Sequence, residues 1–228
     1  MLIGIISSKL TSSKIIGFYG MEKVEKNDGY ELYKNKNKIL VVVNEDESNI
    51  EKSLIYLYSE YDPKLIFSFG LSESISNDHM NGDIVLPNVF VELNDEIENT
   101  LFTKENLDSF LKDPIFLESY TLQNDYDFDK FGLSVGGICV SGSKETGIDL
   151  REKIKFAYEA DIYDRNSYLI LTEAKNMNII ERLYVISAIY NKDDSIHLDQ
   201  IIENGLYILN FLLDNVSKEE EEVIEVEI

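Results

Sequence analysis

The sequence has few positive charges: 21 Lys and Arg stand against 43 Asp and Glu, which gives a formal net charge of −22 over 228 residues. Because so acidic a chain repels the phosphate backbone of nucleic acids, we expect no nucleic acid partner. No run comes close to the roughly 20 consecutive apolar residues that a membrane helix needs. The first residues, MLIGIISSKLTSS, also lack the basic start and long apolar stretch of an export signal. We therefore expect a soluble, cytoplasmic protein without a membrane partner.

Cysteine, histidine and proline are also scarce, with one, two and three residues. The single Cys139 cannot form a disulfide within the chain, and His79 and His197 lie far apart, so we predict no metal site and no other cofactor. The chain contains neither a P-loop nor a G-x-G-x-x-G motif after its first apolar run, and so lacks the usual cradles for nucleotide phosphates. Its hydrophobic residues, 44% of the total, suffice for one sizeable core, so we expect a folded protein.

No internal repeat or linker divides the chain, so we predict a single domain over residues 1–217 and an acidic tail over 218–228. The tail, KEEEEVIEVEI, carries six Glu and one Lys. We expect it to be a frayed, solvated end, although its alternation of Glu with Val and Ile could also add an edge strand.

Short β-branched runs alternate with helical patterns, which is typical of α/β sheet proteins. Strands are predicted at 2–7, 14–19, 29–33, 39–43, 65–69, 83–93, 133–141 and 183–189. Helices are predicted at 50–61, 148–158, 164–176 and 199–216, with a short helix at 103–111 and a short segment at 160–163. Gly136 and Gly137 indicate a bulge or a close backbone approach within their strand. His197 is expected at the start of the last helix.

The segment 63–87, PKLIFSFGLSESISNDHMNGDIVLP, carries the most specific pattern. A strand ends at Gly70, a small polar turn follows, and Gly82-Asp83 opens the next strand. This order and spacing resemble the nucleoside phosphorylase and nucleosidase superfamily, particularly the bacterial methylthioadenosine/S-adenosylhomocysteine nucleosidases. LIGIIS at the start of the chain and CVSGS at 139–143 resemble the first strand and the Val-Ser-Gly-Asp of that family.

The resemblance implies a three-layer α/β/α fold with a central mixed, mostly parallel sheet. It also implies a purine nucleoside or base as ligand, self-association into a homo-oligomer, and no metal or redox cofactor. By position, the residues expected to bind the ligand are Gly70, Ser72, Ser141, Asp164 and Asn166.

The family cleaves the N-glycosidic bond of purine nucleosides, and this chain departs from its pattern at the sugar. Where the family has a Met-Glu pair that binds the ribose, this chain has Arg165 and Asn166, with Asp164 one place earlier. An amide can hydrogen-bond a hydroxyl, but it cannot supply the anion that stabilises a developing oxocarbenium ion. Asp164 itself is either a ribose ligand or the N-cap of the following helix.

The acid that protonates the departing base is also missing. Asn191 occupies its position in the catalytic segment, and a neutral amide is not a useful proton donor. Asp193 and Asp194 are the candidate acids that would have to replace it, and both could instead be ordinary turn residues.

Further departures concern the nucleophile. Thr11 and Ser12 stand where the nucleosidases have the glutamate thought to activate water. Glu45, Asp46 and Glu73 occupy turns that are rich in glycine in the family, so we expect repulsion of phosphate and of phosphorylated ligands.

Three hypotheses follow. The first is a divergent, catalytically impaired nucleosidase-like protein that keeps a purine nucleoside pocket. The second is an active purine nucleoside hydrolase, rather than a phosphorylase, that uses relocated acids: Asp164 at the ribose and Asp193 or Asp194 at the base. The third is a non-enzymatic interaction protein in which the acidic surface and tail are the active parts.

Overall fold

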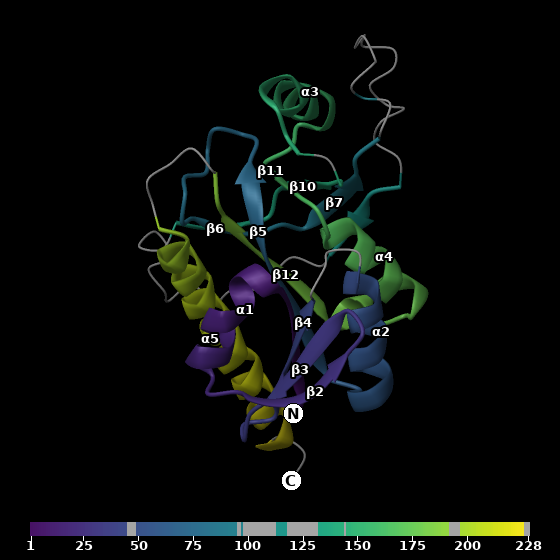
Figure 1. Ribbon diagram of the computed structural model, residues 1–228, viewed down its shortest axis with the longest axis vertical. Helices are drawn as coiled ribbons and strands as arrows, with labels where there is room; N and C mark the ends of the chain where they lie inside the picture. Colours follow the sequence, from purple (N-terminus) through teal and green to yellow (C-terminus); the bar gives the residue numbers. More distant parts are fainter. Residues whose placement is uncertain are drawn as a thin grey trace.

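A mixed β-sheet forms the middle layer of the structure, and helices cover both of its faces (Figure 1). Helices α1 (Lys9–Phe18) and α5 (Leu198–Glu225) pack on one face, and α2 (Ile50–Tyr61) and α4 (Ser167–Asn176) pack on the other. The predicted three-layer α/β/α fold is therefore confirmed. The computed structural model describes residues 1–44, 49–94, 97, 113–117, 132–143, 145–191 and 197–225, with side chains as far as residue 214.

Twelve strands form the sheet within the described part of the chain. In chain order they are β1 (Ile3–Ser8), β2 (Glu22–Asn27), β3 (Tyr30–Lys34), β4 (Ile39–Asn44), β5 (Leu65–Ser74), β6 (Ile84–Leu86), β7 (Val89–Glu92), β8 (Ile115–Phe116), β9 (Leu133–Val135), β10 (Ile138–Ser141), β11 (Ile162–Asp164) and β12 (Leu183–Ile189). The other helical elements are α3 (Ile148–Tyr158) and the 3-10 turn η5 (Ile180–Arg182). The spatial order is β2-β3-β4-β1-β5-β11-β10-β7-β8, and β12 continues from β5 to β6 and β9.

Strand β5 joins the two parts of this sheet. It pairs in parallel with β1 as far as Phe69 and with β12 as far as Ser72. Glu73 and Ser74 then pair antiparallel with β11. Because the pairing with β1 stops at Phe69, residues 70–74 reach beyond the carboxyl end of β1 and border the space above it.

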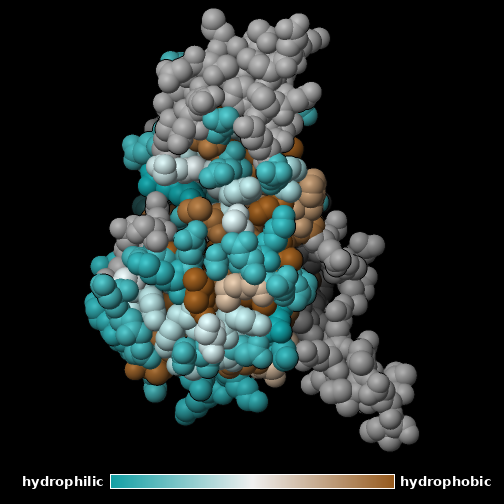
Figure 2. Space-filling model, turned by 90° about the vertical axis from the view of Figure 1, so that its right-hand side faces the viewer, coloured by the Kyte–Doolittle hydropathy of each residue, from teal (hydrophilic) through white to brown (hydrophobic). Residues whose placement is uncertain are grey.

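Alternation along the central strands builds the two hydrophobic layers. Ile39, Val41 and Val43 of β4 belong to the cluster under α1 and α5, whereas Leu40 and Val42 belong to the cluster under α2 and α4. Both clusters contain fully buried side chains, as expected for parallel strands covered on both faces. On the outside, the side of the molecule that carries α2 and α4 is mixed, with hydrophobic residues in small patches among hydrophilic ones (Figure 2).

The predicted strand at 14–19 is wrong, because residues 9–18 form helix α1. Ile15 is fully buried against the sheet. The neighbouring Lys14 reaches α5, where its Nζ lies 3.0 Å from Glu203 and 3.4 Å from Asp199. The apolar run around Ile15 is too short to distinguish a strand from one buried helical turn by periodicity, and packing against α5 decides between them.

Two predicted strands are each divided in the structure. Pro87 follows β6, and β7 begins only at Val89, so 83–93 is not one strand. Gly136 and Gly137 separate β9 from β10 with φ angles of 95° and 104°. A Cβ atom on Gly137 would lie 2.7 Å from a carboxylate oxygen of Asp161, so the predicted close approach is confirmed.

Helix α5 continues through most of the segment predicted as a tail, so the alternative of an edge strand is wrong as far as Glu225. The helix predicted at 103–111 lies outside the described residues. Within the described ranges, none of the helices has the length and apolar character needed to cross a membrane.

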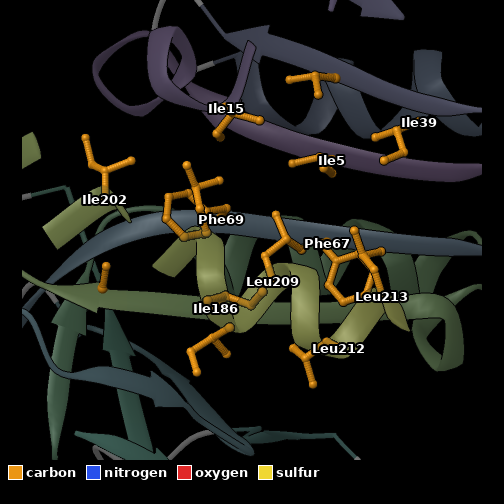
Figure 3. Close-up of a cluster of buried hydrophobic side chains, with 14 of the residues drawn as sticks. Ile5, Ile15, Ile39, Phe67, Phe69, Ile186, Ile202, Leu209, Leu212 and Leu213 are labelled. Atoms are coloured by element: carbon orange, nitrogen blue, oxygen red, sulfur yellow. The ribbon is translucent and has the colours of Figure 1, made fainter. Parts of the chain in front are cut away.

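Helix α5 approaches β5 very closely at Gly205. This glycine is buried, and a Cβ atom at its position would overlap the ring of Phe69. Phe69 belongs to the cluster in which Ile15, Phe69 and Leu209 bring together α1, β5 and α5 (Figure 3). A residue larger than glycine would force the helix and the sheet apart.

We predict that Gly205→Ala lowers the free energy of unfolding by about 1–3 kcal/mol through overpacking, although alanine is the better helix former. The matched control is Gly17→Ala, because Gly17 is exposed in α1 and a Cβ atom there would meet no atom within 4 Å. That control should raise stability by about 0.4–1 kcal/mol. Urea unfolding followed by circular dichroism measures both, and an unchanged or raised stability of Gly205→Ala would contradict this packing.

Candidate functional site

A cavity of about 490 Å³ opens at the carboxyl ends of β1, β4, β5 and β12, which all run in the same direction. In open α/β sheets this edge is the usual place for a ligand. The turn from β11 into α4 closes another side. The cavity is lined by residues 6–10, 44, 50, 68–73, 163–167, 185–187 and 190.

The structure brings four of the predicted ligand-binding residues to this cavity: Gly70, Ser72, Asp164 and Asn166 all line it. Gly70 and Ser72 lie on the part of β5 that reaches beyond β1, and Asp164 and Asn166 lie where β11 turns into α4. The fifth, Ser141, does not line the cavity, but its hydroxyl donates a 2.5 Å hydrogen bond to Asp164.

Asp164 is a buried carboxylate whose two oxygens are both occupied by donors of the protein. Its Oδ1 accepts hydrogen bonds from the Ser141 hydroxyl and from the backbone N–H groups of Asn166 (3.3 Å) and Ser167 (3.2 Å). Its Oδ2 accepts from the Ser167 hydroxyl. The N-cap of α4 is Asn166, so the prediction of Asp164 as the N-cap is wrong; Asp164 holds the start of the helix from two residues before that position.

The pKa of Asp164 reflects two opposing effects. Burial raises the pKa of this carboxyl above its ordinary value of 3.8, because the charged form is removed from water. The hydrogen bonds from the serine hydroxyls and backbone N–H groups lower it, since they favour the charged form, but burial is the larger effect. The Ser141 hydroxyl also accepts a 3.0 Å bond from the N–H of Tyr168, so one network connects β10, β11 and α4.

Asn191 does not line the cavity, because its side chain is used to hold the backbone. Its Oδ1 accepts a 3.0 Å hydrogen bond from the N–H of Ser74. Its own N–H donates to Oδ1 of Asn81, and Nδ2 of Asn81 donates to the Asn191 carbonyl at 3.0 Å. The N–H of Tyr190 donates to the carbonyl of Ser72 at 2.9 Å. The end of β12 is thereby fixed to the end of β5.

The two candidate acids, Asp193 and Asp194, lie outside the described residues, as do Glu45 and Asp46. Glu73, the third of the acidic residues predicted in turns, is described, and that prediction is wrong for it: it lies within β5, which continues to Ser74 because Glu73 and Ser74 pair with β11. It lines the cavity, and its carboxylate accepts a hydrogen bond from the Thr146 hydroxyl.

The positions of the missing water-activating glutamate are occupied by buried hydroxyls. Thr11 and Ser12 are both buried in α1 and do not line the cavity. The Thr11 and Ser7 hydroxyl oxygens are 2.5 Å apart, and the Ser12 hydroxyl donates to the carbonyl of Lys9 at 3.0 Å. These groups serve the start of α1.

Sequence reasoning missed Lys9 as a cavity residue and noted Arg165 only as a departure from the family's pattern. Lys9 lines it from the first turn of α1, and Arg165 lines it from the β11–α4 turn, where its Nη2 lies 3.6 Å from Glu145. A lysine that follows an apolar run carries no signal of its own. Strand β5 pairs with both β1 and β11, and only this arrangement reveals that the start of α1 lies near the turn after β11. Within the described part of the chain, no three His, Cys, Asp or Glu side chains come together as a metal site would require.

Comparison with known proteins identifies the fold. The sequence matches no protein-family model and no curated protein. The structure is similar to a variant of Helicobacter pylori MTAN with 5'-methylthioadenosine in the active site, with a TM-score of 0.71 and 13% identity over 94% of this chain and 98% of that one. It is also similar to Campylobacter jejuni 5'-methylthioadenosine/S-adenosyl homocysteine nucleosidase (TM-score 0.68, 14% identity, 96% and 99% covered). Futalosine hydrolase of H. pylori strain 26695 gives a TM-score of 0.73 at 14% identity, with 94% and 98% covered. The chain therefore has a nucleoside phosphorylase/nucleosidase-like fold.

We predict that Asp164→Asn lowers the free energy of unfolding near pH 7 by about 1–3 kcal/mol, because one of the two acceptor oxygens becomes an NH2 group that faces donors of the chain. The variant also removes one titration. Because the pKa of this carboxyl in the folded protein is raised above 3.8, the folded state binds the proton more tightly than the unfolded state does. The stability that this proton contributes is present at low pH and is lost as the pH rises through the pKa of the folded carboxyl. The free energy of unfolding of wild type should therefore exceed that of the variant by the largest amount near pH 4 and by the smallest amount near pH 8.

Urea unfolding of both proteins at a series of pH values measures this difference. Asp149→Asn is the control, because Asp149 is exposed in the first turn of α3, and its effect should stay within about 0.5 kcal/mol. A difference between wild type and Asp164→Asn that grows with pH would show that the carboxylate is stabilised in the folded state and would contradict the dominance of burial.

Proposed function

We propose that this protein binds a purine nucleoside in the cavity and that its cleavage of the N-glycosidic bond is impaired. Three features support binding. The cavity lies where ligands bind in open α/β sheets, and its volume of about 490 Å³ lies within the common range for small-molecule sites. A protein of the same fold holds 5'-methylthioadenosine in its active site.

The single observation that carries the impairment is the state of Asp164. Among the described residues that line the cavity, Asp164 is the one with a buried carboxylate. Four donor groups of the chain bind its two oxygens. Cleavage needs a carboxyl group that gives a proton to the departing base and an anion near the ribose hydroxyls. A carboxylate whose oxygens already hold the start of α4 is available neither to protonate the departing base nor to bind the ribose hydroxyls.

The neighbouring polar residues are neutral amides. Asn166 lines the cavity and can hydrogen-bond a sugar hydroxyl, but it brings no negative charge to a developing oxocarbenium ion. Asn191 is committed to the backbone of Ser74 and cannot act as an acid. Losing one preorganised electrostatic interaction at a transition state costs on the order of 10²–10³ in rate, so two such losses favour binding without efficient turnover.

We predict that methylthioadenosine, S-adenosylhomocysteine, adenosine or inosine raises the melting temperature and that little free base appears, with or without phosphate. At a ligand concentration of about 100 times Kd, the stabilisation should be about 2.7 kcal/mol, or about 5–10 °C for a chain of this size. Differential scanning fluorimetry measures the shift and chromatography measures the base. If no nucleoside shifts the melting temperature and no base is released, nucleoside binding is contradicted. The hypothesis of a non-enzymatic, acidic interaction protein then remains.

A second candidate function is an active purine nucleoside hydrolase, and one observation favours it. Tyr190 lines the cavity, and the chain passes from there through Asn191 toward Asp193 and Asp194. The segment that holds both candidate acids therefore begins at the ligand site. In a loop, an acid that lies two or three residues further along the sequence can take over a catalytic position without any change to the fold.

For this second candidate we predict that Asp193→Asn combined with Asp194→Asn abolishes release of base while the melting-temperature shift by nucleoside remains. Asp78→Asn is the control, because Asp78 is exposed on the turn after β5 and outside the cavity lining. Chromatographic detection of adenine from methylthioadenosine gives the readout. Turnover by wild type that survives the double substitution would reject Asp193 and Asp194 as the acids.

A further inference from the structure

Three aromatic residues line the cavity within the described part of the chain, and they differ in exposure. Phe69 and Tyr163 are 2% and 3% exposed. The ring of Phe69 packs against α5 at Gly205, and the Tyr163 hydroxyl donates to the carbonyl of Gly142 at 2.7 Å. Tyr190, in contrast, is only partly buried. Of the three, it is therefore the one that keeps an accessible surface at the cavity.

Tyr190 is the first residue after β12, and its side chain packs against the hydrophobic cluster under α1 and α5. A partly exposed aromatic ring on such a support offers a planar, apolar surface with a hydroxyl at its edge. Nucleic acid bases are planar and stack on rings of this kind. A residue that directly follows a strand can serve this purpose only if its backbone is held in place.

The backbone around Tyr190 is held from both sides. From β5, the carbonyl of Ser72 accepts from the N–H of Tyr190 at 2.9 Å. From the turn before β6, the carbonyl of Asp83 accepts from the N–H of Ile189 at 2.9 Å, and the N–H of Gly82 donates to the carbonyl of Ile189 at 3.0 Å. The antiparallel pairing of β12 with β6 thus continues beyond the paired strand residues, as far as the neighbour of Tyr190.

Asn81 extends this pairing past Tyr190 with its side chain. Its Oδ1 accepts from the N–H of Asn191, and its Nδ2 donates to the carbonyl of Asn191 at 3.0 Å. One planar amide thus satisfies the donor and the acceptor of one backbone residue, which neither a carboxylate nor an apolar side chain can do. Asn81 is 7% exposed and does not line the cavity, so this amide serves the chain and not a ligand.

The turn that carries Asn81 is held by hydrogen bonds of its own. The N–H of Met80 donates to Oδ2 of Asp83 at 2.8 Å, and the N–H of Asp83 donates to the carbonyl of Met80 at 3.0 Å. Gly82 has a φ angle of 92°, and its carbonyl accepts from Nδ2 of Asn204 in α5 at 3.0 Å. Asn81 is therefore fixed to the body of the protein and can hold the end of β12 against it.

We propose that Tyr190 is the aromatic surface on which the cavity binds the base of its ligand, and that Asn81 is the positioning residue that keeps Tyr190 in the cavity wall. This inference rests on the proposed function and deepens it, because it names the part of the nucleoside that meets the end of β12. Tyr190 touches the ligand, whereas Asn81 acts only through the backbone of Asn191. The ligand has to present a planar ring system at this place.

Substitutions of Tyr190 test the stacking. Tyr190→Leu keeps an apolar side chain but removes the ring, and it should weaken binding of methylthioadenosine by about 5- to 100-fold. Tyr190→Phe, which keeps the ring, should restore most of that loss. Tyr207→Leu is the control, because Tyr207 is 56% exposed on α5 and lies outside the cavity lining, and it should bind with the wild-type Kd. Isothermal titration calorimetry on the full chain gives the Kd values.

A double-mutant cycle tests the positioning role. Asn81→Ala should weaken binding by about three- to tenfold, as expected if Tyr190 is then correctly placed for only about a third to a tenth of the time. In the Tyr190→Leu background the same substitution should not change Kd further. Asn35→Ala is the control for a loss of stability alone. The Asn35 side chain also holds backbone, because it accepts from the N–H groups of Asn37 and Ile39 at 3.0 Å in the turn before β4. This control should lower the melting temperature and leave Kd unchanged.

Loss of affinity in Tyr190→Leu that Tyr190→Phe restores supports the inference. A Kd of Tyr190→Leu equal to that of wild type overturns it and leaves the proposed function standing. Equal losses in the Leu and Phe variants also overturn it, because the ring is then not the contact. An effect of Asn81→Ala that is the same in both backgrounds, or absent in both, rejects the positioning role. If wild type binds neither methylthioadenosine nor adenosine nor inosine, the proposed function and the inference both fail.

Discussion

The structure depends on the length of β5, which has to satisfy backbone hydrogen bonds on two sides and in two directions. Parallel pairing with β1 and β12 occupies its first part, and antiparallel pairing with β11 begins at Glu73. Where the neighbours change, β1 has already turned away into α1, so the strand edge there faces open space. The cavity occupies that space. A strand that ended at Phe69 would leave the two parts of the sheet unconnected and the cavity without its central wall.

Around this cavity, most polar groups already serve the chain itself. Asp164 accepts from the first N–H of α4, Asn191 holds the end of β5, and Glu73 accepts from Thr146. The fold is similar to that of the nucleosidase structures, and the two carboxylates of the described lining, Glu73 and Asp164, both accept hydrogen bonds from the chain itself. Glu73 lies within β5, Asp164 is the last residue of β11 and Asn191 follows β12, so these committed groups all belong to strands or directly follow them.

The sequence predicted the central elements well, because burial on both faces leaves a strong pattern. The helix at 50–61 and the strand at 183–189 have their predicted bounds. It failed where tertiary contacts decide: α1 looked like a strand, and the polar, largely exposed β2 gave no alternation to detect. The resemblance to the nucleosidases led to Gly70 and Ser72, which line the cavity, whereas it gave no indication of Lys9, whose place depends on which strands lie side by side. That Asn191 and Asp164 are occupied by internal bonds is likewise visible only in three dimensions.

The contact between Gly205 and Phe69 connects helix α5 to a residue that lines the cavity. Phe69 touches α5 from beneath, and it is also among the residues that border the cavity, next to Gly70. Phe69 thus packs against helix α5 and also borders the cavity. The size of the cavity can therefore be changed from position 205 of α5, which does not line it, without altering any residue of the lining.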